Sequence, residues 1–168
     1  VSDWAHCATL RGQIAPGKFG DYLVDLARQY NEALLGWERN NHGWGVMERI
    51  TTHHGYPNVY YYQGIGDMHG DGRYGFPTTG WNKPHLVGLA QAAMSTGSWH
   101  SWDSELIGQY MTLQDKGNGR YDTSVLDIAM SDMLCHAARP QARPPFRKRA
   151  ESKPFAPRYL LKGRHATH

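Results

Sequence analysis

The chain has 168 residues and an apolar content ordinary for a globular protein, which bounds it to about one domain. No apolar run approaches the roughly 18 residues that a membrane span needs, and no cleavable leader is recognisable, so we expect a soluble chain that is not exported. The net charge of +3 conceals an asymmetry: residues 1–138 hold nine Lys and Arg against fourteen Asp and Glu, whereas residues 139–168 hold nine against one.

Strand and helix patterns alternate along the first half. A strand is expected over residues 4–14, and apolar residues at helical spacing predict a helix over residues 19–30. The short apolar run 33–37 ends in the polar cluster 38–43, which is typical of a buried central strand that opens into a loop. A second helix is expected over residues 44–54.

The second half continues this alternation. Residues 58–62 read as a strand, and the glycine-rich residues 63–80 as a loop or β-hairpin. A helix is expected from Asn82 to Gly97, a short strand over residues 99–102, and then a helix capped by Asp103 or Ser104.

The last predicted helix begins at Asp122, as its N-cap, and runs to Ala137. Beyond it, prolines accompany the basic residues, so residues 139–168 are expected to be a flexible, disordered tail. The alternation favours an α/β layer architecture, with a domain over residues 1–138.

Two carboxylates stand at places where a metal site is plausible. Glu38 follows a predicted strand and Asp122 precedes a predicted helix, and carboxylate oxygens are the ligands that Mg²⁺ prefers. Spacing alone leaves the alternatives open, because Glu38 could pair with a surface cation and Asp122 could act only as a cap. The Asp67, His69, Asp71 alternation resembles a metal site, but its glycine-rich surroundings favour a plain polar hairpin.

Several short strings, in order, resemble the nuclease domain of the large terminase subunit of tailed bacteriophages. The most specific are Glu38-Arg39-Asn40-Asn41-His42-Gly43 and Gly80-Trp81-Asn82-Lys83-Pro84; the others are residues 11–19, 30–35 and 56–60. The resemblance covers most of residues 4–138.

The resemblance implies a ribonuclease H-like mixed sheet flanked by helices, with three acidic residues that hold two Mg²⁺ or Mn²⁺ ions. Glu38 matches the second acid and Asp122 the third. The first acid, an Asp on the family's first strand, has no match, so the chain is expected to be truncated at its N-terminus and to cut poorly as it stands. The third position is less regular, because Thr123 and Asp127 depart from the family's pattern.

Further residues are assigned lesser roles. Arg39 and Lys83 are candidates for phosphate contact or solvated charges, and His42 is a candidate for assisting the metal site or bonding to backbone. The basic tail suits a polyanion, because each cation that meets a phosphate releases counterions. Its candidate contacts are Arg143, Arg147, Lys148 and Arg149. We expect most of the tryptophans, including Trp37, Trp44, Trp81, Trp99 and Trp102, to lie in the core.

The leading hypothesis is thus a metal-dependent endonuclease that cuts concatemeric double-stranded DNA during genome packaging in the cytoplasm of the host bacterium. The implied partners are an ATPase region, a portal and a small terminase subunit, with no membrane. One alternative is a catalytically incomplete remnant that binds DNA or docks on the portal. Another is a different ribonuclease H-like nuclease, related to resolvases or integrases.

Overall fold

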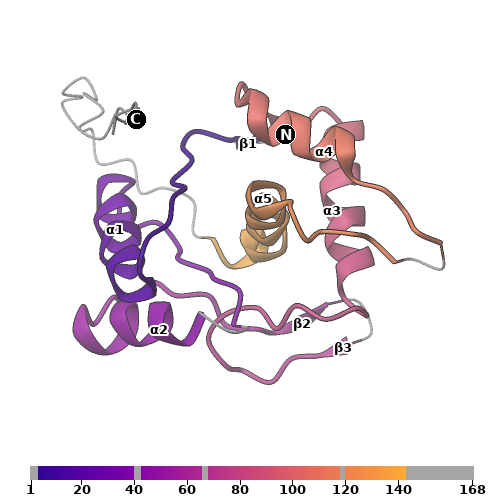
Figure 1. The fold of residues 1–168 in the computed structure, drawn as a ribbon. Helices are drawn as coiled ribbons and strands as arrows, with labels where there is room; N and C mark the ends of the chain where they lie inside the picture. The colour runs from indigo at the N-terminus through magenta and orange to yellow at the C-terminus, as the bar shows by residue number, and fades with distance from the viewer. Residues whose placement is uncertain (1–3, 40–42, 66–67, 118–119, 143–168) are drawn as a thin grey trace, which may run out of the picture.

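A computed structural model describes residues 4–39, 43–65, 68–117 and 120–142 (Figure 1). Within these ranges the chain is a mixed α/β protein with five α-helices and a small parallel sheet of two strands. Its elements are, in order, β1 (Trp4–Ala5), α1 (Pro16–Gln29), α2 (Gly43–Glu48), the π-helix η1 (Arg49–His53), β2 (Gly64–Ile65), β3 (Met68–His69), α3 (Lys83–Ser95), β4 (Trp99–His100), α4 (Ser104–Thr112), α5 (Asp127–Ala138) and the 3₁₀ helix η2 (Arg139–Gln141). No helix in the described ranges is long and apolar enough to cross a membrane.

One group of helices consists of α1, α2 and η1. The apolar stripe of α1 buries Val24 and Ala27, and Ile50 of η1 is fully buried in the same cluster. The helix predicted over residues 44–54 is confirmed as α2 continued by η1. These helices lie on one side of α5 in Figure 1.

The other group consists of α3, α4 and α5. Leu86 of α3, Leu106 of α4 and Met133 of α5 are each fully buried in a second cluster. The helices predicted from Asn82 and from Asp103 are confirmed as α3 and α4. Asp103 caps α4 as expected, because its carboxylate accepts hydrogen bonds from the backbone N–H groups of Glu105 and Leu106.

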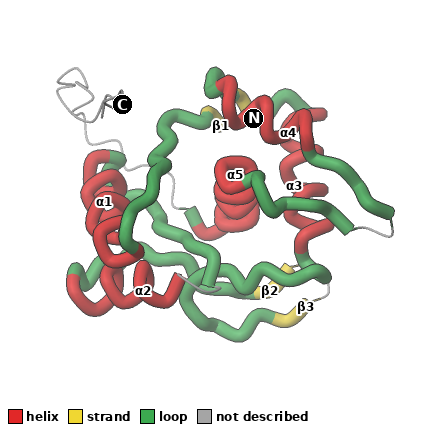
Figure 2. The backbone as a smooth tube through the Cα atoms, viewed as in Figure 1, coloured by secondary structure: helices red, strands yellow, loops and turns green. Residues whose placement is uncertain are grey.

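Strand pairing is sparse, and most of the backbone that joins the two helical groups is loop (Figure 2). β1 runs parallel to β4, and β2 pairs antiparallel with β3, which agrees with the hairpin alternative for residues 63–80. The segments predicted as strands at 33–37 and 58–62 meet at a single parallel bridge, between Leu35 and Val59. The mixed α/β class is therefore confirmed, whereas the ribonuclease H-like sheet stays a prediction.

The strand predicted over residues 4–14 is wrong in its length. Only Trp4–Ala5 is a strand, held by the N–H groups of Trp4 and His6 donating to Ser98 and His100. Beyond β1 the segment is held by side chains, because the hydroxyl of Thr9 donates a hydrogen bond to Asp103. An apolar pattern cannot reveal this, because a strand needs a partner backbone from a distant part of the chain.

A charged cluster joins α1 to the end of η1. Asp21 accepts hydrogen bonds from Arg49, at 2.5 Å, and from His54, at 2.7 Å. These two partners, Arg49 first, lower the pKa of the Asp21 carboxyl from 3.8 to about 2. The ionised carboxylate therefore connects two elements that are far apart in the sequence.

We expect this cluster to stabilise the fold only while Asp21 is ionised. A lowered pKa contributes stability that is present in full above the unfolded pKa near 3.8 and is lost as pH falls through about 2. Urea unfolding at pH 5 and at pH 2 should show Asp21→Asn to be less stable than the parent at pH 5, with the difference shrinking at pH 2. Asp25→Asn, an exposed change on the same helix, serves as the control. A gap of equal size at both pH values would contradict the linkage.

Candidate functional site

Glu38 lies at the end of the segment that leaves the α1 group. Its neighbours are bonded to Phe76 on both sides: the N–H of Phe76 donates to Trp37 at 2.8 Å, and the N–H of Arg39 donates to Phe76 at 2.9 Å. Trp37 is buried beneath the segment, whereas Glu38 is exposed. The alternation of a strand-like backbone thus directs the glutamate to solvent.

The first residue of α2, Gly43, packs closely against the backbone of Glu38. A Cβ atom on Gly43 would overlap the carbonyl oxygen of Glu38 and lie 3.6 Å from the Trp37 ring. Only a glycine lets the helix approach the backbone this closely. Gly43 therefore helps to define the position of the Glu38 backbone.

Arg39 is engaged rather than simply solvated. Its guanidinium donates to both carboxylate oxygens of Asp71, at 3.0 and 2.6 Å, and lies 5.9 Å from the centre of the Tyr62 ring. The Arg39 guanidinium lowers the pKa of Asp71 to about 2. Contact between Arg39 and a phosphate stays a prediction, and it would have to compete with this bidentate pair. His42 lies outside the described residues.

Asp122 is not the N-cap of the last helix, which corrects the sequence-based expectation. α5 begins at Asp127, and Asp122 Oδ1 instead accepts hydrogen bonds from the N–H and the hydroxyl of Ser124. The cap comes from another helix: the side-chain oxygen of Gln109 on α4 accepts the N–H groups of Ile128 and Ala129, at 3.0 and 2.9 Å.

Asp122 lies in a cationic environment. Its pKa is lowered, chiefly by the hydrogen bonds from Ser124 and further by the charges of Lys116 and Lys83. The ammonium of Lys83 donates to the hydroxyl of Thr123 at 2.8 Å. The structure therefore brings two of the predicted residues, Lys83 and Asp122, into one neighbourhood, although 39 positions separate them in the sequence.

Residues 76–83 connect the two predicted acids. At one end of this segment Phe76 bridges Glu38, and at the other Lys83 contacts Thr123 beside Asp122. The side chain of Asn82 stiffens the segment by donating to the carbonyl of Pro77 at 2.7 Å. A close approach of the Glu38 and Asp122 carboxylates stays a prediction.

The chemistry of these two residues fits a hard divalent cation. Both side chains are exposed, and the lowered pKa of Asp122 extends the range in which its carboxylate is ionised to more acidic pH. In the described ranges, no three His, Cys, Asp or Glu side chains gather closely enough to hold a metal ion. Metal binding by Glu38 and Asp122 therefore stays a prediction.

The basic tail begins close to a described contact. Gln141 donates to the carbonyl of Tyr61 at 2.6 Å and accepts the N–H of Tyr61 at 3.2 Å. This pairing ties the chain to the folded body three residues beyond the expected boundary at 138. The predicted tail contacts, Arg143, Arg147, Lys148 and Arg149, lie outside the described residues.

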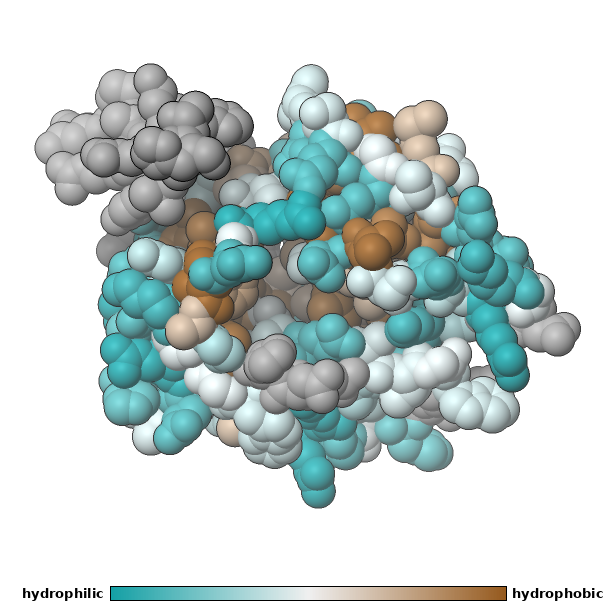
Figure 3. All heavy atoms as spheres, in the orientation of Figure 1, coloured by the Kyte–Doolittle hydropathy of each residue, from teal (hydrophilic) through white to brown (hydrophobic). Residues whose placement is uncertain are grey.

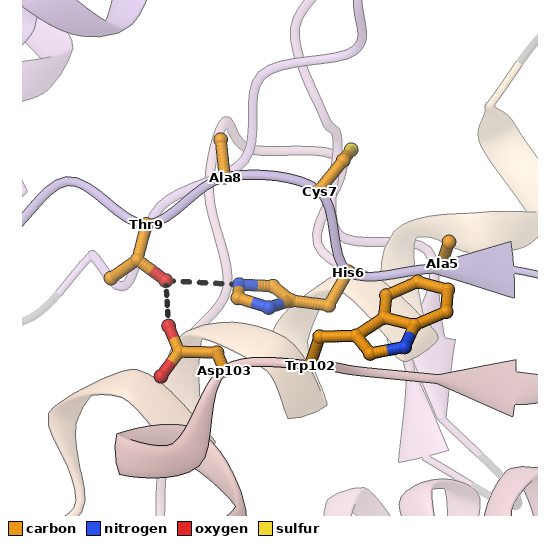
Figure 4. A pocket seen from close by; sticks show the side chains of 7 residues that line it. All are labelled: Ala5, His6, Cys7, Ala8, Thr9, Trp102 and Asp103. Atoms are coloured by element: carbon orange, nitrogen blue, oxygen red, sulfur yellow. Dashed lines mark hydrogen bonds between the residues drawn. The ribbon is translucent and has the colours of Figure 1, made fainter. Parts of the chain in front are cut away.

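A shallow pocket of about 420 Å³ lies where the N-terminal segment meets the start of α4 (Figure 4). His6 contacts Ser101 at 3.1 Å and Thr9 at 3.0 Å, and the Thr9 hydroxyl donates to Asp103 at 2.7 Å. Because these polar groups bond to one another, they join two segments that are 94 residues apart. We assign this network a structural role.

Sequence reasoning missed a buried acid on α5. Asp132 is 8% exposed and accepts hydrogen bonds from the Trp99 indole, at 3.2 Å, and the Tyr110 hydroxyl, at 2.7 Å. His136 lies 3.5 Å from the same carboxylate. The (i, i+4) spacing of Asp132 and His136 was the only available signal, since the other two partners come from β4 and α4.

The chain matches no family model, no curated protein and no solved structure.

Proposed function

We propose that this chain is the nuclease region of a phage terminase large subunit, a divalent-metal-dependent endonuclease that cuts concatemeric double-stranded DNA during packaging. The sequence strings around Glu38 and Lys83 support this proposal. The observation that carries it is the segment 76–83, which adjoins Glu38 at one end and the neighbourhood of Asp122 at the other. The proposal includes a ribonuclease H-like fold for this domain.

In this proposal Glu38 and Asp122 hold Mg²⁺ or Mn²⁺. The bound metal supplies an activated water and stabilises the leaving oxygen of the phosphodiester. Lys83 has a separate role, because its ammonium donates to Thr123 and so anchors the loop that carries Asp122. Arg39, once released from Asp71, would contact a phosphate.

The proposal extends to location and partners. The chain would act in the cytoplasm of the host cell, joined to an ATPase region and working with a portal and a small terminase subunit. Double-stranded DNA is the substrate, and the basic residues after 142 add affinity that depends on salt.

The test combines metal binding with cleavage. Glu38→Gln and Asp122→Asn should each weaken Mn²⁺ binding, measured by calorimetry, because each removes a charged oxygen ligand. In a chain extended upstream to include the expected first strand, each should lower plasmid cleavage on the order of 100-fold or more. The extended parent should cut faster than the 168-residue chain.

Glu48→Gln is the matched control, because Glu48 is also exposed and stands at the end of α2. Unchanged cleavage in Glu38→Gln would refute the assignment. DNA binding without cleavage in the extended parent would favour the non-catalytic remnant instead.

A further inference from the structure

Trp81 departs furthest from its expected place in the core. Its side chain is 88% exposed, more than any other large apolar residue in the described ranges, whereas Trp37 is 6% exposed. Apolar surface on the face in Figure 3 is divided into separate patches among hydrophilic residues. Exposing an indole forgoes the large apolar burial that a tryptophan can contribute, so its position calls for an explanation.

The turn that carries Trp81 is internally fixed. The next residue, Asn82, is 2% exposed, and all of its side-chain polar groups are used: its oxygen accepts the N–H of Thr79 at 2.8 Å, and its nitrogen donates to Pro77 at 2.7 Å. The N–H of Lys83 also donates to Thr79 at 3.1 Å. Trp81 is therefore presented to solvent on a preorganised backbone, which reduces the entropic cost of binding.

A cation follows this turn. Lys83 is two residues beyond Trp81, and its ammonium donates to the hydroxyl of Thr123 at 2.8 Å. Lysine is depleted in the centres of protein–protein interfaces, whereas an exposed aromatic side chain together with a positive charge is the combination found on surfaces that bind single-stranded nucleic acid.

We propose that Trp81 is a stacking platform for an unpaired base of DNA, with Lys83, two residues along the same segment, to meet a phosphate. The inference rests on the proposed function and deepens it, because stacking requires an exposed base face. A paired base within a duplex does not offer that face. The preferred substrate region is therefore one in which at least one base next to the cutting site is unpaired.

The experiment compares two probes on the full chain in EDTA, so that no strand is cut. One is a fluorescent 12-nucleotide single strand of thymidines, and the other is a 12-base-pair duplex. Loss of one stacked base lowers affinity by about 1 to 3 kcal/mol, which is on the order of tenfold or more. Trp81→Ala should therefore lose about tenfold in affinity for the single strand and far less for the duplex, whereas Trp81→Phe should retain most of it.

Trp102→Ala is the matched control, because that indole is 82% exposed but lies beside the pocket near α4. The comparison of the single-strand to duplex affinity ratio between each variant and the parent removes attraction by the basic tail, because the tail is the same in all of them. The ratio of single-strand affinity to duplex affinity should fall only in Trp81→Ala. If this ratio is the same for Trp81→Ala as for the parent or for Trp102→Ala, the stacking role is overturned and a protein partner is favoured for this surface. If the parent binds neither probe, the proposed nuclease function itself fails.

Discussion

Replacing Gly43 by alanine should lower the free energy of unfolding by about 3 kcal/mol, the upper end of the usual cost of overpacking. The added Cβ would overlap the carbonyl oxygen of Glu38, which is backbone and cannot rotate away as a side chain can. Either α2 or the segment ending at Glu38 must shift. Urea unfolding followed by far-UV circular dichroism measures the loss.

Gly88→Ala is the matched control for this substitution. Gly88 lies within α3, and a Cβ there would meet no atom within 4 Å. Alanine in a helix interior should stabilise the chain by roughly 0.5 to 1 kcal/mol. The two variants should thus change stability in opposite directions, and a Gly43→Ala variant as stable as the parent would show that α2 does not press on Glu38.

Removing the carboxylate of Asp132 should cost about 3 kcal/mol or more. Burial by itself would raise the pKa of Asp132, but His136 and the Tyr110 hydroxyl outweigh it, and the pKa is lowered. Asp132→Ala would leave the partly buried Tyr110 hydroxyl and Trp99 indole N–H without their acceptor. Breaking a buried charged network by deleting one member is among the most costly single changes.

Thermal unfolding with near-UV circular dichroism tests this second prediction, because Trp99 and Tyr110 both contribute to that signal. Asp132→Asn keeps an acceptor oxygen and should fall between the parent and Asp132→Ala. Ser131→Ala, an exposed change on the same helix, should be nearly neutral. A small effect of Asp132→Ala would mean that water replaces the carboxylate and that the network contributes little.

The helices could be recognised from local signals. α1, α3 and α4 follow apolar spacings that repeat every three or four residues, and such patterns depend only on neighbours along the chain. The signal that ends α3 is also local: Gly97 adopts a φ of +64°, which a glycine accepts without strain. The positions of Glu38 at the end of an apolar run and of Lys83 at a helix start were found in the same way.

Contacts between distant segments decided the strand lengths, the start of α5 and which tryptophans are buried. The expected strand over residues 4–14 shortened to β1 because only Trp4 and Ala5 find a partner strand, and the start of α5 moved to Asp127 because Gln109, from another helix, caps it. Burial of a tryptophan likewise depends on what packs over it: Trp37 is covered by α2, whereas the turn of Trp81 projects into solvent. Local spacing carries no information about such partners, since they are brought together only when the helices pack.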